Sequence, residues 1–164
     1  MKLFGITGNK NSGKTHLIER LVNEISKRGF SVSTIKHAHH DADIDKPGRD
    51  TYRHRKAGAR QVVLSTKNRL AIMTENLDSP GKTLEEIISL MDKVDVVIIE
   101  GYKNSIHSKI ETYRKTTGNP LLARSNSSIK AIASDVSLID IKIPVFGLNN
   151  TKDIVDFILK ELGL

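Results

Sequence analysis

A glycine-rich segment near the start of the chain has the residue types and spacing that bind phosphate. Residues 8–15, Gly-Asn-Lys-Asn-Ser-Gly-Lys-Thr, match the pattern G-x-x-x-x-G-K-[ST] at every fixed position. The two glycines let the backbone take positive φ, so that successive N–H groups converge on an anion. A glycine-rich turn without a ligand is the alternative. The strand and helix patterns on either side of the segment disfavour it.

We therefore predict that this loop binds a nucleotide together with Mg²⁺. In such loops the lysine, here Lys14, reaches the outer phosphates, and the last hydroxyl, here Thr15, binds the metal. The residues expected to bind the phosphates are Gly8, Asn9, Lys10, Asn11, Ser12, Gly13, Lys14 and Thr15.

A second candidate for the metal follows another apolar run. Glu100 comes directly after residues 96–99 and before Gly101, which allows a sharp turn. A phosphate loop needs an acidic group near its Mg²⁺, usually at the end of a neighbouring strand. Glu100 and Thr15 are thus the predicted metal ligands, and Lys14 and Glu100 the predicted catalytic residues. An exposed carboxylate at a strand end is the alternative for Glu100.

Residues 36–45, K-H-A-H-H-D-A-D-I-D, hold three histidines and three aspartates. These residue types could bind a transition metal, although the segment lacks cysteine and the helical pair of histidines found in zinc proteases. Ligands of open parallel sheets bind beyond the carboxyl ends of the strands, where this segment is expected. Lys36 is therefore predicted to add positive charge near the phosphates, and the aspartates could reach water molecules bound to Mg²⁺. A solvated polar loop is the third possibility.

Composition narrows the class of protein. The chain has 164 residues and no cysteine, which excludes a disulfide scaffold, and its formal net charge is +7. The positive excess lies between Lys27 and Arg69, with eleven Lys and Arg against four Asp, and favours anionic ligands. Aromatic residues make up only 4%, and the signatures of nucleic-acid binding are missing. No apolar run is long enough for a membrane span, and the N-terminus does not follow a signal-peptide pattern. We expect a cytoplasmic protein that binds neither nucleic acid nor membrane.

Apolar strand-like runs alternate with amphipathic helical segments along the chain. Strands are expected over 2–7, 30–35, 95–99, 109–114, 129–133 and 143–148, and helices over 14–28, 51–57, 83–93 and 151–162. Thr83 and Glu86 fit a capping box that opens the third of these helices. This alternation predicts an α/β protein in which helices cover both faces of a mostly parallel sheet. Together with the phosphate loop between the first strand and the first helix, it is typical of a P-loop NTPase fold. Residues 61–65 and 70–74 break the pattern and predict a β-hairpin insertion near 60–76. The length predicts a single domain over residues 1–164.

Several segments together resemble the MobB family of molybdopterin-guanine dinucleotide biosynthesis adapter proteins. The resemblance is carried by residues 8–15, 34–41, 45–52, 57–59, 99–103 and 109–111. It implies a GTP-binding protein with weak GTPase activity that uses Mg²⁺ and works as a homodimer paired through an extended β element. Its implied partner is the guanylyltransferase that joins GTP to Mo-molybdopterin. Contacts with Mo-molybdopterin itself and with molybdoenzymes are a plausible extension.

The resemblance also implies roles for individual residues. Lys36, the histidine-rich loop and Arg49-Asp50 would line the same cleft as the phosphate loop. The sequence lacks the N-K-x-D motif that often reads guanine, so Asp135 is the preferred candidate and residues 149–153 are the second. Asn149 or Asn150 could equally be a turn residue or a helix N-cap. The preference for GTP over ATP rests on the resemblance.

Two further functions remain open at the level of sequence. A small-molecule kinase could use the same phosphate loop. A metal-delivery GTPase could carry its cargo on the cluster His37–His40.

Overall fold

The computed structural model describes residues 1–38, 43–77 and 81–164, and these fall into two compact units. The first unit comprises residues 1–38 and 93–164, and the second comprises residues 39–92. Each unit is described by itself below. The single domain expected from the chain length stays a prediction.

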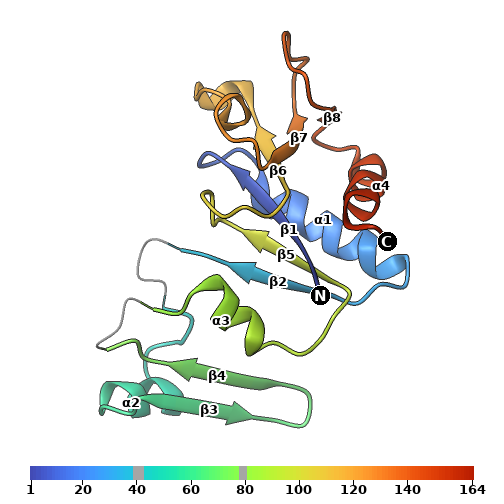
Figure 1. Ribbon diagram of the computed structural model, residues 1–164. Helices are drawn as coiled ribbons and strands as arrows, with labels where there is room; N and C mark the ends of the chain where they lie inside the picture. The colour runs from blue at the N-terminus through green and yellow to red at the C-terminus, as the bar shows by residue number, and fades with distance from the viewer. Residues whose placement is uncertain (39–42, 78–80) are drawn as a thin grey trace. The chain divides into compact units, whose positions relative to one another are not determined.

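The first unit is built on a six-stranded sheet in the order β2-β5-β1-β6-β7-β8 (Figure 1). Every pairing in this sheet is parallel. The strands are β1 (Lys2–Gly8), β2 (Val32–Lys36), β5 (Val96–Glu100), β6 (Lys109–Tyr113), β7 (Ile129–Ser134) and β8 (Val145–Gly147). The phosphate-loop strand β1 lies between β5 and β6, so both neighbours end beside the loop. The predicted α/β architecture with a mostly parallel sheet is confirmed.

Two helices pack together on one face of this sheet (Figure 1). In α1 (Lys14–Lys27), the fully buried residues Leu17, Leu21 and Ile25 are spaced four apart and form one stripe. In α4 (Thr151–Leu162), the inward stripe includes Ile154 and Ile158. Burying each such side chain contributes roughly 1.5–3 kcal/mol. This core fixes the start of α1, where the phosphate loop ends.

The opposite face of β6 is covered differently. Ile110 points into the helical core, so its neighbours Lys109 and Glu111 point to the other face, where both are fully buried. The Glu111 carboxylate accepts hydrogen bonds from the backbone N–H groups of Leu122 (2.9 Å) and Ala123 (2.8 Å). These residues open the short 3-10 helix η2 (Leu122–Arg124). At β6, the second face is therefore covered by a 3-10 turn instead of the expected α-helix.

Lys109 organises the connection that precedes β6. Its ammonium donates to the carbonyl oxygen of His107 (2.9 Å), the hydroxyl of Ser128 (3.0 Å) and the carbonyl oxygen of Ser105. The segment 104–108 is thus held by a buried side chain. Burial lowers the pKa of Lys109. The three acceptors satisfy the ammonium where water does not reach it.

The second unit contains α2 (Asp50–Lys56), β3 (Gln61–Ser65), β4 (Leu70–Thr74) and α3 (Leu84–Ser89). Strands β3 and β4 form an antiparallel hairpin whose turn is closed by the hydrogen bond from Thr66 N to Arg69 O. The predicted hairpin is confirmed, with the predicted strand bounds. Arg55 joins the parts of this unit through ion pairs to Asp43, Asp45 and Glu75.

Three expected element boundaries differ from the structure. Thr83 and Glu86 form the expected capping box, but α3 ends at Ser89 instead of near residue 93, because Asp92 and Lys93 add no apolar side chain to its buried face. Asp50 is the first residue of α2, and Arg49 is its N-cap. β2 begins at Val32, because residues 28–30 complete the turn that ends α1. Among the described residues, no helix is both long and apolar enough to cross a membrane.

Replacing Glu111 with Ala should lower the free energy of unfolding by at least about 2 kcal/mol, because two buried N–H donors lose their acceptors. Urea denaturation of the variant measures this loss. Asp92, an exposed carboxylate, gives the matched control Asp92→Ala, which should change stability by less than about 0.5 kcal/mol. Equal stability of the two variants would contradict the role given to Glu111.

His107 should make stability depend on pH. Burial, with a smaller contribution from Lys109, lowers the pKa of His107 from 6.5 to about 4. The unfolded chain therefore binds more protons between these values, and the contribution of His107 to stability is lost as pH falls from 6.5 towards 4. Because the ring is only half-buried, we expect a loss of about 1–2 kcal/mol. Urea titrations at pH 7 and pH 4.5 should show a smaller loss for His107→Gln than for the unaltered protein.

Candidate functional site

The phosphate loop connects β1 to α1 and takes the positive φ values that its sequence predicts. Gly8, Asn11 and Gly13 have φ of 144°, 64° and 97°. Gly8 also lies so close to β6 that an added Cβ would be 2.5 Å from the carbonyl oxygen of Thr112. Glycine is therefore required at position 8 by both conformation and space.

Ser12 ties the loop to β6. Its hydroxyl donates to the carbonyl oxygen of Asn9 (2.8 Å) and shares a hydrogen bond with the Thr112 hydroxyl (2.7 Å). The Thr112 hydroxyl also lies 3.2 Å from Thr7 O. Because a hydroxyl has a single proton, Thr112 donates to Ser12 or to Thr7 O at any one time. Both Ser12 and Thr112 are about 1% exposed. The Ser12 side chain thus holds the loop in shape, and Thr112 is a supporting residue that the sequence pattern did not reveal.

Lys14, the first residue of α1, folds back over the loop. Its ammonium donates to the carbonyl oxygens of Gly8 (3.1 Å) and Asn9 (2.8 Å). Burial is the main cause that lowers the pKa of Lys14; Glu100 raises it, while Lys103 and Lys36 lower it further. The ammonium is consequently a partly desolvated cation at the mouth of the loop, where an anion would gain most from it.

A cavity of about 510 Å³ opens over the loop and the start of α1. Its lining residues are Lys10, Asn11, Gly13, Lys14, Thr15, His16, Glu100 and Arg114. The structure thus brings Thr15 and Glu100, the two predicted metal ligands, to the wall of one cavity with Lys14. A hydroxyl and a carboxylate are hard oxygen donors of the kind that Mg²⁺ prefers. Arg114 was not among the predicted site residues.

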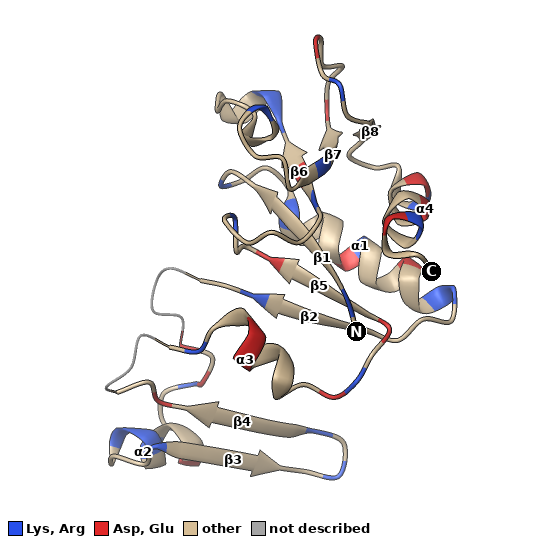
Figure 2. Ribbon diagram, in the orientation of Figure 1, with Lys and Arg blue, Asp and Glu red and all other residues tan. Residues whose placement is uncertain are grey.

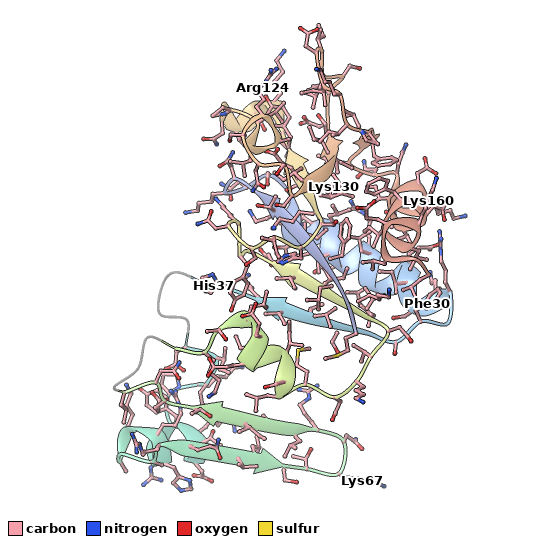
Figure 3. All side chains as sticks on the ribbon, viewed as in Figure 1. Phe30, His37, Lys67, Arg124, Lys130 and Lys160 are labelled. Carbon is pink, nitrogen blue, oxygen red and sulfur yellow. The ribbon has the colours of Figure 1, made fainter. Side chains whose placement is uncertain are left out.

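Lys36 and His37 lie at the same edge of the sheet as Glu100. Lys36 pairs with Glu100 in the strand register, and its ammonium is 3.8 Å from the Glu100 carboxylate. His37, labelled in Figure 3, donates its backbone N–H to Glu100 O (2.9 Å). Its ring stacks on Tyr102 with centroids 4.5 Å apart. Neither Lys36 nor His37 lines the cavity, so both flank the predicted metal ligand.

The turn after Glu100 is compact. Gly101 has φ of 98°, and an added Cβ would lie 3.0 Å from the Cβ of His37. Tyr102 follows with φ of 45°, a conformation that non-glycine residues rarely adopt. The turn holds the stacked His37 and Tyr102 rings beside the carboxylate.

The structure describes the other predicted site residues to different extents. Asp135 follows β7 and accepts a hydrogen bond from the backbone N–H of Lys115 (3.0 Å). Asp50 belongs to the second unit, so its place in the nucleotide cleft stays a prediction. His39, His40 and Asp41, the centre of the proposed transition-metal cluster, are outside the described residues. Within residues 1–38, 43–77 and 81–164, no group of three or more His, Cys, Asp or Glu is arranged to hold a metal ion. Asn150 occupies the N-cap position of α4, one of the two roles considered for it.

Comparison with known proteins gives consistent results. Residues 3–135 match the family model of MobB, molybdopterin guanine dinucleotide synthesis protein B. The chain is 36% identical over 152 residues to the molybdopterin-guanine dinucleotide biosynthesis adapter protein of Escherichia coli (strain K12), covering 91% of this chain and 86% of that protein. The adapter protein of Haemophilus influenzae is 37% identical over 158 residues, which cover 95% and 86% of the two chains.

Solved structures share the fold. The crystal structure of Bacillus subtilis MobB superposes with a TM-score of 0.78 at 23% identity, covering 99% of this chain and 98% of that chain. A MobB homologue from Bacillus stearothermophilus gives a TM-score of 0.75 at 22% identity and covers 99% of each chain.

Replacing Thr112 with Val keeps the shape of the side chain but removes the partner of the Ser12 hydroxyl. We expect the free energy of unfolding to fall by about 1–2 kcal/mol. Thr116→Val, at an exposed position that follows β6, is the control and should stay within about 0.5 kcal/mol of the unaltered protein. Chemical denaturation measures both; a Thr112→Val protein as stable as the control would show that the hydrogen bond does not support the loop.

Proposed function

Because the chain belongs to the MobB family, molybdopterin guanine dinucleotide synthesis protein B, we propose that it binds GTP and Mg²⁺ as an adapter in molybdopterin-guanine dinucleotide biosynthesis. The observation that carries this proposal is the position of the Lys14 ammonium. It is partly desolvated, it is bound to carbonyl oxygens of the phosphate loop, and it lines the same cavity as that loop. A chain of phosphates fits this arrangement because it is negatively charged and its oxygens accept hydrogen bonds from N–H groups.

The phosphates would bind across the loop residues 8–15. Lys14 exchanges its bonds with the carbonyl oxygens of Gly8 and Asn9 for bonds with phosphate oxygens, which are stronger because both partners are charged. Backbone N–H groups at the start of α1 lack partners within the helix and donate to the same phosphates.

Thr15 and Glu100 would hold Mg²⁺ on the cavity wall. The metal, when bound, neutralises charge on the outer phosphates. Lys36, with its ammonium 3.8 Å from Glu100, balances that carboxylate and keeps its charge available at the edge of the sheet. Slow hydrolysis of GTP fits a site that positions phosphates with Lys14 and Glu100.

Recognition of guanine is assigned to Asp135 on the strength of its place at the end of β7. Its Oδ1 accepts the N–H of Lys115, and its second oxygen can accept from a ligand. His37 completes the set of residues of the first unit that are proposed to face the nucleotide.

The proposed partner is the guanylyltransferase that joins GTP to Mo-molybdopterin in the cytoplasm. The second unit carries positive charge suited to the phosphate of a pterin: Figure 2 shows Lys and Arg along α2 and at the β3–β4 turn. The exposed residues concerned are Arg53, Lys56, Lys67 and Arg69. Such a surface would also serve contacts with molybdoenzymes.

The hairpin β3–β4 is the proposed dimer element. Val63 and Ile72 are directly opposite one another in the register, and Leu70 shares their face. Their exposed fractions are 53%, 57% and 62%, which is high for large apolar side chains. Pairing with the same hairpin of a second copy would cover this face.

Lys14→Ala should weaken GTP binding roughly a hundredfold, because the charged partner of the phosphates is lost. Isothermal titration calorimetry with GTP, GDP and ATP measures the affinity, and GTP should bind more tightly than ATP. Lys27→Ala, at the far end of α1, is the matched control and should bind GTP normally. If Lys14→Ala binds GTP as tightly as Lys27→Ala does, the loop is not the nucleotide site.

Ile72→Asp should convert the dimer into a monomer, because a carboxylate would be buried against the partner's apolar face. Light scattering at a fixed protein concentration gives the mass. Lys67→Asp at the tip of the hairpin, labelled in Figure 3, introduces the same carboxylate outside that face and should leave the dimer intact. A dimeric Ile72→Asp protein would refute pairing through β3–β4.

A further inference from the structure

Arg114 directly follows β6 and its side chain lies against the phosphate loop. A Cβ placed on Gly13 would be 3.2 Å from Nε and 3.4 Å from Nη2 of Arg114, so the guanidinium lies alongside the residue that precedes α1. The same side chain lines the cavity with Lys14, Thr15 and Glu100. A second cation thus borders the space proposed for the phosphates.

The backbone around Arg114 is fixed on both sides. Tyr113 pairs with Ser134 in the sheet, and the N–H of Lys115 is bound by the Asp135 carboxylate. The carbonyl oxygen of Arg114 accepts hydrogen bonds from the N–H (3.1 Å) and the hydroxyl (2.8 Å) of Thr117. The 3-10 helix η1 (Lys115–Thr117) therefore begins at a defined place. The fixed backbone sets the direction of the Cα–Cβ bond, from which the Arg114 side chain extends to the loop.

The N–H groups of the Arg114 guanidinium are available to a ligand. Across the described parts of the chain, no carboxylate or carbonyl oxygen is within hydrogen-bond distance of it, whereas other arginines are engaged. Arg20 donates to Leu148 O (2.6 Å), and Arg55 donates to Glu75 (2.8 Å). An arginine beside a phosphate loop, with its planar fork free, suits bidentate binding of a phosphate.

The charges of the cavity favour the same ligand. Lys10, Lys14 and Arg114 line it together with a single carboxylate, Glu100. A cavity with this excess of positive charge attracts a polyanion.

We propose that Arg114 binds the phosphate chain of the nucleotide, as a second cation supplied by β6 in addition to Lys14. This inference rests on the proposed function, because it assumes that the loop binds a nucleotide. Arg114 lies outside the phosphate-loop motif, so the segment after β6 would also take part in binding the nucleotide.

The test compares Arg114→Ala and Arg114→Lys with the unaltered protein by isothermal titration calorimetry, using GTP and inorganic tripolyphosphate. Arg114→Ala should bind both ligands at least about tenfold more weakly, and Arg114→Lys should recover part of the loss because it keeps the charge but not the fork. Arg124→Ala is the matched control, since Arg124, labelled in Figure 3, lies in η2. It lines a different cavity with Asp140 and Lys142. This variant should bind within twofold of the unaltered protein.

Thermal unfolding of each variant separates binding from folding. An Arg114→Ala protein that melts with the unaltered protein and binds GTP within twofold of it would overturn the proposal while leaving the proposed function standing. A loss for GTP without a loss for tripolyphosphate would place Arg114 at the base or ribose and would also overturn it. If Arg114→Ala does not fold, the same comparison is made with Arg114→Lys, which should then show a loss of about threefold or more. Absence of GTP binding by the unaltered protein would refute the proposed function and this inference together.

Discussion

The short distance between β6 and the phosphate loop determines the conformation of the loop backbone, on which the rest of the site depends. Thr112 pairs with Gly8 in the strand register, leaves no space there for a Cβ, and binds Ser12 through its hydroxyl. Two points of one short loop are thereby fixed to one residue of a neighbouring strand. A loop of backbone N–H groups binds an anion only when their directions are set before the ligand arrives. The hydrogen bond between two buried hydroxyls supplies that rigidity without placing a side chain in the space of the ligand.

The sheet order then determines which charges meet. Because β1 lies between β5 and β6, Glu100 from one neighbour and Arg114 from the other border the same cavity. β2 pairs with β5 and adds Lys36 and His37 beside Glu100. Charged side chains from three segments that are distant in sequence, Lys36, Glu100 and Arg114, therefore lie at one edge of the sheet. The parallel arrangement causes this, since all the strands end at the same edge.

The sequence predicted well those features that depend on local chemistry. The phosphate loop, the hairpin with its four-residue turn and the capping box of Thr83 and Glu86 are each specified by residues within a few positions of one another. Features that depend on strand pairing could not be found in this way. Thr112 supports Ser12 across a hundred positions, and Arg114 reaches the loop only because β6 pairs with β1. Buried Lys109 and Glu111 resemble solvent-facing residues of an alternating strand, and only the cover provided by η2 shows that they are internal.

Lys109 has a consequence for which substitutions the connection before β6 can accept. Its ammonium binds the main-chain oxygens of Ser105 and His107, and carbonyl oxygens are common to every amino acid. The path of residues 104–108 is therefore determined mainly by the side chain of Lys109, which lies outside the segment, and depends little on the side chains within it. The exposed Ile106, 97% accessible, illustrates this independence. Related chains could diverge freely at such positions and still run the same course between β5 and β6, provided that the lysine is retained.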